Sequence, residues 1–137
     1  MSDLVVILRE YGKIEEAEKL DKKVLKARTK AFDTDHSDTI EAMVCLAVTF
    51  WRSGKLEEAR MLFQRVLRLR TEAFGTNHPD TIVTMSHFAS TLRRLGKLEE
   101  AEKLDQDVVK LRIETFGTNK LDSIRAMSNL AATLRAG

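Results

Sequence analysis

The segment Gly54-Lys55-Leu56-Glu57-Glu58-Ala59 recurs as GKIEEA at residues 12–17 and as GKLEEA at residues 96–101. Successive copies begin 42 residues apart. Aligned without gaps, residues 54–95 and 96–137 are identical at 24 of 42 positions, and residues 12–53 and 54–95 at 21 of 42. A fixed period of this length is typical of repeat architectures. The sequence therefore predicts one repeat array over residues 1–137, made of a partial unit 1–11 and the units 12–53, 54–95 and 96–137.

The apolar residues of each unit recur every three or four positions, which is the spacing of a helix that buries one face. In the middle unit, Ala59, Leu62 and Val66 follow one another in this way. Glycines near the unit boundaries suit helix ends, because glycine tolerates a left-handed backbone. No window alternates with period two, which argues against the blades of a β-propeller. The pattern predicts helices over residues 2–11, 13–32, 37–53, 55–74, 79–95, 97–116 and 121–136.

The composition is that of a globular protein in a reducing compartment. The chain has 137 residues and a net charge of +2, with 32% charged and 43% hydrophobic residues, which argues against disorder. Its single cysteine, Cys45, excludes an intramolecular disulfide and a paired-cysteine redox or metal site. The longest apolar run, residues 4–8, is far shorter than the ~18 residues that a membrane span needs. We therefore expect a protein of a reducing compartment, cytoplasmic by default or nuclear, with no membrane-spanning segment.

The positions that recur in the three units resemble the tetratricopeptide repeat. That motif has a small residue in its first helix, a glycine between its helices and an alanine early in its second helix. The corresponding residues are Ala47, Ala89 and Ala131, then Gly54 and Gly96, then Ala17, Ala59 and Ala101. The resemblance implies an all-α, right-handed superhelical solenoid of antiparallel helix pairs that acts as a non-enzymatic module for protein–protein interaction.

The unit length of 42 residues departs from the 34 residues of the usual tetratricopeptide repeat. The long form, with GKLEEAEKL followed by a run that ends in FGTNHPDT, resembles the repeats of kinesin light chains. It also resembles the near-identical C-terminal repeats of fungal and bacterial signalling proteins of the NACHT/NB-ARC type. One position of the second helix departs from the motif, because its aromatic residue is present only as Phe63 and is replaced by Asp21 and Asp105. We expect looser packing in the two flanking units.

Residue types that could support metal binding or catalysis do not form a recognisable constellation. His36 and His78 lie one repeat apart, too distant to share an ion at ~2 Å ligand distances, and their common position suits a helix start. His87 has no cysteine or histidine at ligand spacing, and Cys45 has no activating base in the sequence pattern. The recurring Glu pairs lie at helix starts, where they face the positive end of the helix dipole. We therefore expect no metal, no cofactor and no enzymatic activity.

The concave face is the expected binding surface, because the first helix of each pair lines it in the family that this chain resembles. The residues placed there vary between units, whereas the packing positions repeat. Arginine, serine and asparagine at these places suit an acidic or C-terminal peptide of another protein. The low aromatic content of 6% and the absence of a long basic stripe argue against nucleic acid as partner. The groove candidates are Trp51, Arg52, Ser86, His87, Ser90, Arg93, Arg94, Arg125, Ser128, Asn129 and Arg135.

An alternative function is self-association. Solenoids usually need a polar cap at each end, and neither end of this sequence has a recognisable one, as expected of a fragment of a longer array or of a chain that associates through its ends. Copies could then stack end to end, or exchange a terminal helix to form a homo-oligomer. The candidates for such end contacts are Leu4, Val5, Leu8, Ile124, Leu130 and Leu134.

Overall fold

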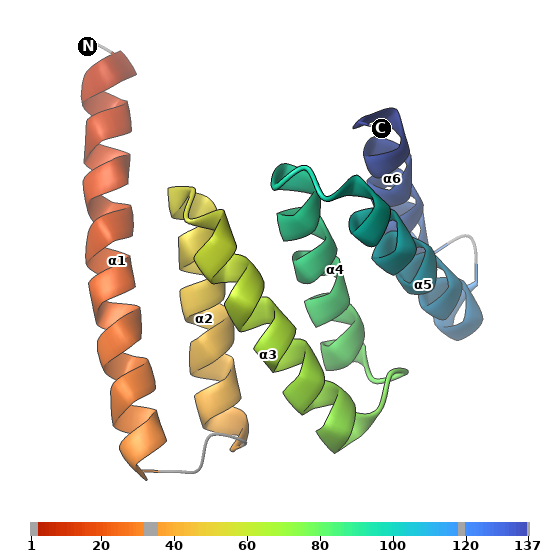
Figure 1. Cartoon of the computed structure of the whole chain (residues 1–137), viewed down its shortest axis with the longest axis horizontal. Helices are drawn as coiled ribbons and strands as arrows, with labels where there is room; N and C mark the ends of the chain where they lie inside the picture. The colour runs from red at the N-terminus through yellow and green to blue at the C-terminus, as the bar shows by residue number, and fades with distance from the viewer. Residues whose placement is uncertain (1–2, 32–35, 118–119, 137) are drawn as a thin grey trace. The chain divides into compact units, whose positions relative to one another are not determined.

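The computed structural model describes residues 3–31, 36–117 and 120–136, with the side chains of residues 3–11 and 116 left out. This part of the chain is almost entirely helical, and it contains no β-strand (Figure 1). The helices are α1 (Asp3–Ala31), α2 (Ser37–Ser53), α3 (Leu56–Phe74), α4 (Pro79–Arg94), α5 (Leu98–Phe116) and α6 (Leu121–Ala136).

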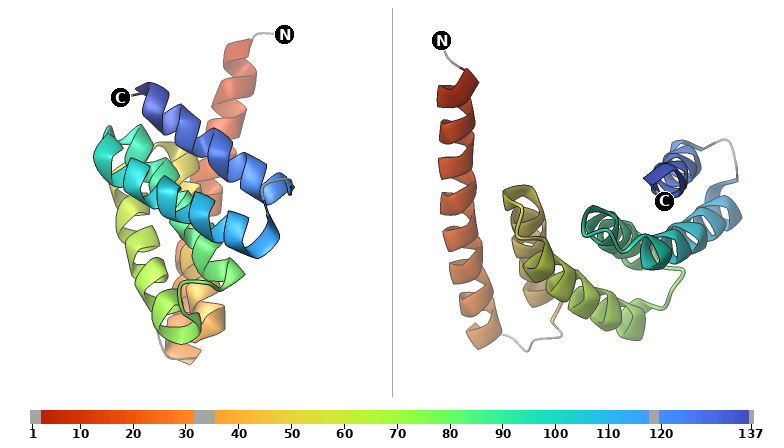
Figure 2. Two further views of the ribbon diagram at one scale, coloured as in Figure 1. Left: turned by 90° about the vertical axis from the view of Figure 1, so that its right-hand side faces the viewer. Right: turned by 45° about the horizontal axis from the view of Figure 1, so that its top comes forward.

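The chain forms two compact units, Met1–Val66 and Leu67–Gly137, and the boundary falls within α3. In the first unit, α1 packs along α2, and the two helices run antiparallel (Figure 1). In the second unit, α5 packs against both α4 and α6 (Figure 2). The core of this second unit joins Ile82 and Met85 of α4 to Val108 of α5 and Ala126 of α6.

The helix starts are fixed by the two histidines that recur in the sequence. Nδ1 of His36 accepts a hydrogen bond from the backbone N–H of Asp38 at 3.1 Å, and Nδ1 of His78 accepts one from Asp80 at the same distance. Each histidine thereby satisfies one of the unpaired N–H groups at a helix N-terminus. The expected structural role of these histidines at a helix start is therefore confirmed.

Two of the recurring glycines form the tight turns at the boundaries between the 42-residue units. Gly54 has φ +86° and Gly96 has φ +82°, a conformation that only glycine adopts at little cost. After each glycine the next backbone N–H bonds back across the turn, from Lys55 to the carbonyl of Phe50 and from Lys97 to that of Leu92, both at 2.9 Å. These bonds satisfy the last carbonyl groups of α2 and α4.

The predicted helix break at Gly12 is wrong. Gly12 occupies the position of Gly54 and Gly96 in the repeat, but α1 runs through it without interruption from Asp3 to Ala31. A glycine inside a helix costs only about 1 kcal/mol relative to alanine, and an unbroken helix keeps every backbone hydrogen bond that a turn would lose. The other five helices begin and end within one residue of the predicted positions.

Candidate functional site

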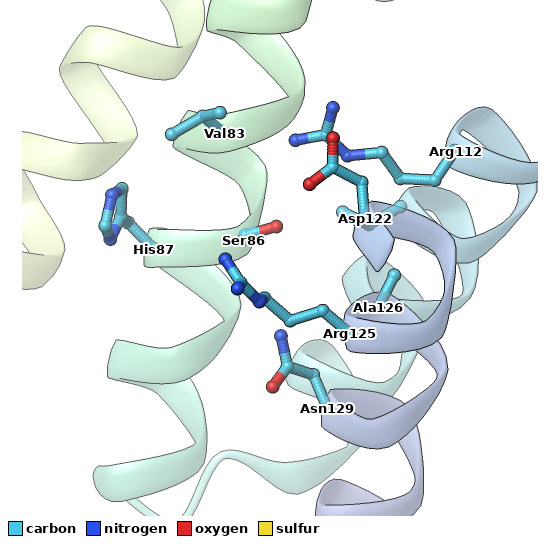
Figure 3. A pocket seen from close by; sticks show the side chains of 9 residues that line it. Val83, Ser86, His87, Arg112, Asp122, Arg125, Ala126 and Asn129 are labelled. Carbon is cyan, nitrogen blue, oxygen red and sulfur yellow. The ribbon is translucent and has the colours of Figure 1, made fainter. Parts of the chain in front are cut away.

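A cavity of about 280 Å³ lies between α4, α5 and α6 in the second unit. Its base is apolar, because Val108 and Ala126 belong to the buried core. Arg125 and Asn129 point from α6 toward α4, where Ser86 lies opposite them (Figure 3). The full lining is Val83, Ser86, His87, Val108, Arg112, Asp122, Arg125, Ala126 and Asn129.

Four of the predicted groove residues line this cavity, namely Ser86, His87, Arg125 and Asn129. Arg125 and Asn129 occur only in the sequence repeat 96–137, since Val83 and His87 take their places in the repeat 54–95. The variable positions on the first helix of each pair therefore gather at one hollow, at least on α4 and α6.

His87 is half-buried on α4 and points away from Arg125 (Figure 3). Burial lowers the pKa of its imidazole below the usual 6.5, and the positive charge of Arg70 lowers it further. The side chain is therefore neutral at neutral pH. The charged groups at the rim are the two guanidinium groups of Arg112 and Arg125 and the single carboxylate of Asp122, so the cavity has an excess of positive charge.

Sequence reasoning missed Arg112 and Asp122, whose side chains point toward one another at the rim (Figure 3). The predicted groove residues are ones that differ between units, whereas this arginine and this aspartate are the same in all three units. The repeat itself holds the missing signal. Arg28 donates a hydrogen bond to the carbonyl of Asp38 at 2.9 Å, and Arg70 donates one to the carbonyl of Asp80 at 3.3 Å. The same arginine and aspartate positions thus join the two helices of each 42-residue unit, α1 to α2 and α3 to α4.

Arg93 was also a groove candidate, and the structure places it beside the cavity in a different role. Its Nη1 donates hydrogen bonds to the carbonyl of Asn129 and to Oγ1 of Thr133, both at 3.1 Å. The same atom lies 4.0 Å from Oδ2 of Asp105. The side chain is only 24% exposed. Arg93 therefore joins α4 to α5 and α6, and its guanidinium is already engaged within the protein.

Asp105 replaces the aromatic residue of the repeat without leaving a gap. Its side chain is 4% exposed, and its Oδ2 accepts a hydrogen bond from Oγ1 of Thr133 at 2.5 Å. Asp21 accepts the equivalent bond from Thr49 at 2.6 Å in the first unit. Burial raises the pKa of Asp105, while Thr133 and Arg93 act in the opposite direction. The expected looseness of the third repeat is therefore wrong at this position, where a hydrogen bond takes the place of an apolar contact.

The remaining candidates lie elsewhere. Half-buried Trp51 and exposed Arg52 are on α2, in the first unit. Half-buried Ser90 and exposed Arg94 on α4, with exposed Ser128 and Arg135 on α6, are not among the lining residues. Ile124 and Leu134 of the end-contact set are exposed on α6, and Leu130 is half-buried. Leu4, Val5 and Leu8 lie on α1, where the side chains fall outside the described residues.

Over residues 12–31, 36–115, 117 and 120–136, whose side chains are described, no three His, Cys, Asp or Glu residues come close enough to hold a metal ion. Among the described helices, none is long and apolar enough to cross a bilayer.

Comparison with known proteins agrees with the helical repeat structure described above. The family model for the tetratricopeptide repeat matches residues 1–70, 38–113 and 85–137. A solved structure of nearly identical TPR-like repeats from a Podospora anserina kinesin-light-chain-type protein superposes with a TM-score of 0.87 at 21% identity. The match covers 98% of this chain and 64% of that one.

BtubC (BKLC) from P. vanneervenii superposes with a TM-score of 0.79 at 17% identity, over 93% of this chain and 50% of that one. The chain thus spans less than two thirds of the length of both structures. No curated protein matches it in sequence.

Proposed function

The chain belongs to the tetratricopeptide-repeat family and folds as an all-α solenoid of that type, and we propose that it binds an acidic peptide segment of another protein in the cavity between α4, α5 and α6. Tetratricopeptide repeats are in general non-catalytic modules for protein–protein interaction. The observation that supports this particular site is the convergence of Arg125, Asn129 and Ser86 on one hollow with an excess of positive charge.

The size of the cavity fits part of a peptide. Pockets for whole small-molecule ligands are typically about 300–1,000 Å³, and this one is about 280 Å³ and only partly enclosed. One or two side chains of an extended segment fit such a volume. Val108 and Ala126 offer them an apolar base, while the rest of the segment lies along the two helices.

The polar groups suit a carboxylate and a peptide backbone. Arg125 is exposed, so its guanidinium can form two parallel hydrogen bonds with an Asp, Glu or C-terminal carboxylate. The amide of Asn129 both donates and accepts, and the hydroxyl of Ser86 does the same from the opposite wall. His87 stays uncharged at neutral pH, so it adds an acceptor or a donor without adding charge.

An array of short peptides with increasing Asp and Glu content tests the proposal. We expect the protein to bind the acidic members, and Arg125→Glu to weaken that binding tenfold or more, because a hydrogen bond to a charged group contributes about 1.5–3 kcal/mol. Arg68→Glu makes the same charge change at an exposed position on α3 outside the cavity, and should bind as the unmodified protein does.

Arg93 is a poor probe of binding, since its substitution also breaks contacts between helices. Equal binding of acidic and neutral peptides, or full binding by Arg125→Glu, would count against this site.

A further inference from the structure

One face of α6 is apolar and open to solvent. It is defined by Ile124, Met127 and Leu134, which are between 36% and 53% exposed. Residues at these spacings lie on the same side of a helix. Their equivalents one repeat earlier are Ile82, Met85 and Leu92 of α4, which are between 1% and 7% exposed. The two helices thus have the same kind of face, covered on α4 and bare on α6.

The helix that covers α4 is α5. Val108 of α5 is buried in one cluster with Ile82 and Met85, and Leu104 packs against the same cluster. The face of α5 that does this is formed by Ala101, Leu104 and Val108, spaced three and four residues apart. The exposed α6 face would therefore accommodate a helix that carries a face like that of α5.

The chain has a second helix with the same face, and that face is bare. Residues 13–28 of α1 are identical to residues 97–112 at 11 of 16 positions. Ala17, Leu20 and Val24 form the α1 face. Leu20 is 61% and Val24 is 41% exposed, whereas Val108 is 3% exposed. Among the residues that the structure describes, no counterpart of α4 thus packs against the α1 face.

The charges match in the same register. Within the second unit, Arg93 of α4 stands 4.0 Å from Asp105 of α5. The equivalents of these two residues are Arg135, which is exposed on α6, and Asp21, which is half-buried on α1. If α1 lay on α6 as α5 lies on α4, Arg135 would meet Asp21 while the apolar faces met each other. An opposite-charge pair at such a place favours one register over others.

We propose that the α6 face of one copy of this chain binds the α1 face of a second copy, in the geometry that α4 and α5 adopt within one copy. The contact joins two different surfaces, so it is heterologous, and each copy keeps one free surface of each kind. Further copies can therefore add one after another, until the copies close into a ring or no free copies remain. The apolar faces and the pairing of Arg135 with Asp21 both favour α1 of a second copy as the helix that covers α6.

Light scattering over a range of concentrations of the full chain tests the proposal. The average mass should exceed the 15.6 kDa of one chain and rise with concentration. Leu134→Asp blocks the α6 face, and Leu20→Asp blocks the α1 face, so each variant should keep a mass of 15.6 kDa at concentrations where the unmodified protein assembles. Met61→Asp changes an equally exposed apolar residue on α3, outside both faces, and should assemble fully.

Mixing the two blocked variants separates this contact from others. Each variant retains the surface that the other has lost, so the equimolar mixture should contain a complex of two chains and nothing larger. Assembly of Leu20→Asp alone would overturn the proposal in favour of a symmetric contact between two α6 faces. A mass of 15.6 kDa for the unmodified protein at every concentration would overturn it outright.

A charge variant keeps the test valid if either apolar substitution disturbs folding, which circular dichroism would reveal. Arg135→Asp should raise the concentration needed for assembly, because it sets two carboxylates against each other. Arg125→Glu, on the cavity side of the same helix, should leave assembly unchanged although we expect it to weaken peptide binding. The two proposals therefore fail or survive separately, and an unaltered assembly of Arg135→Asp would contradict the register.

Discussion

Replacing Arg93 by alanine tests whether this arginine holds helices together or is free to bind a ligand. The substitution removes the two hydrogen bonds that Nη1 donates to Asn129 and Thr133, and it removes the positive charge nearest to Asp105. Hydrogen bonds from a charged group contribute about 1.5–3 kcal/mol each. Removing one partner of a buried ion pair costs roughly 3–5 kcal/mol.

The separation of 4.0 Å and the 24% exposure of Arg93 place the cost at the lower end of that range. We expect the free energy of unfolding to fall by about 3 kcal/mol and Tm to fall by roughly 10 °C for a chain of this length. Urea titration followed by far-UV circular dichroism measures the first quantity. Arg68→Ala removes an exposed arginine of the same unit and should change stability by no more than about 0.5 kcal/mol.

The pH dependence provides a second readout. Burial raises the pKa of Asp105 above its ordinary value of 3.8, and Arg93 is one of the groups that hold it down. Without Arg93 the pKa of the folded state rises further, while that of the unfolded state does not. The folded variant then gains a proton before the unfolded chain does, so its stability deficit should shrink as pH falls toward 3.8. A deficit equal to that of Arg68→Ala, or one that does not change with pH, would refute the bridging role.

Two further predictions concern the glycine turns and His87. Gly54→Ala should lower the free energy of unfolding by about 1 kcal/mol, because φ is +86° there, whereas Gly12→Ala should raise it by up to about 1 kcal/mol, because Gly12 is helical. An added Cβ meets no atom within 4 Å at either position, so urea titration of these variants measures the effect of backbone conformation alone. Equal changes in stability for the two variants would contradict the difference in conformation. His87 should make the protein less stable as pH falls below 6.5, because its pKa in the folded state is lowered and the unfolded chain takes up the proton first. Thermal melts at a series of pH values should show that His87→Asn removes this loss of stability. A variant with the same pH dependence as the unmodified protein would contradict this role of His87.

The sequence predicted the fold closely because its period is strict. Repetition of the same apolar positions in three units averages out local ambiguity, and five helices begin and end within one residue of the predicted bounds. The exception, Gly12, shows the limit of the method. A shared motif identifies where a turn is possible, but the backbone follows whichever path keeps more hydrogen bonds, and at Gly12 that path is a continuous helix.

The candidate site was predictable only where its residues differ between units. Variation pointed to Arg125 and Asn129, which line the cavity. It also pointed to Arg93, because a sequence cannot tell a guanidinium that faces a groove from one that bonds to the next helix. Arg112 and Asp122 escaped notice for the opposite reason, since the same two residues occur in every repeat. Only distances between helices separate these cases.

The pairing of positions 93 and 105 has a consequence for how such a chain can change in length. Arg93 faces Asp105, whereas Trp51 and Phe63 occupy the same two positions one repeat earlier. An in-frame duplication of residues 96–137 would set Arg135 before a new copy of Asp105, and so reproduce a compatible junction. Duplication of residues 54–95 would instead set Arg93 before a new copy of Phe63. The point at which two repeats recombine therefore decides whether the new junction can form this ion pair. The reading frame and the 42-residue period are kept in both cases.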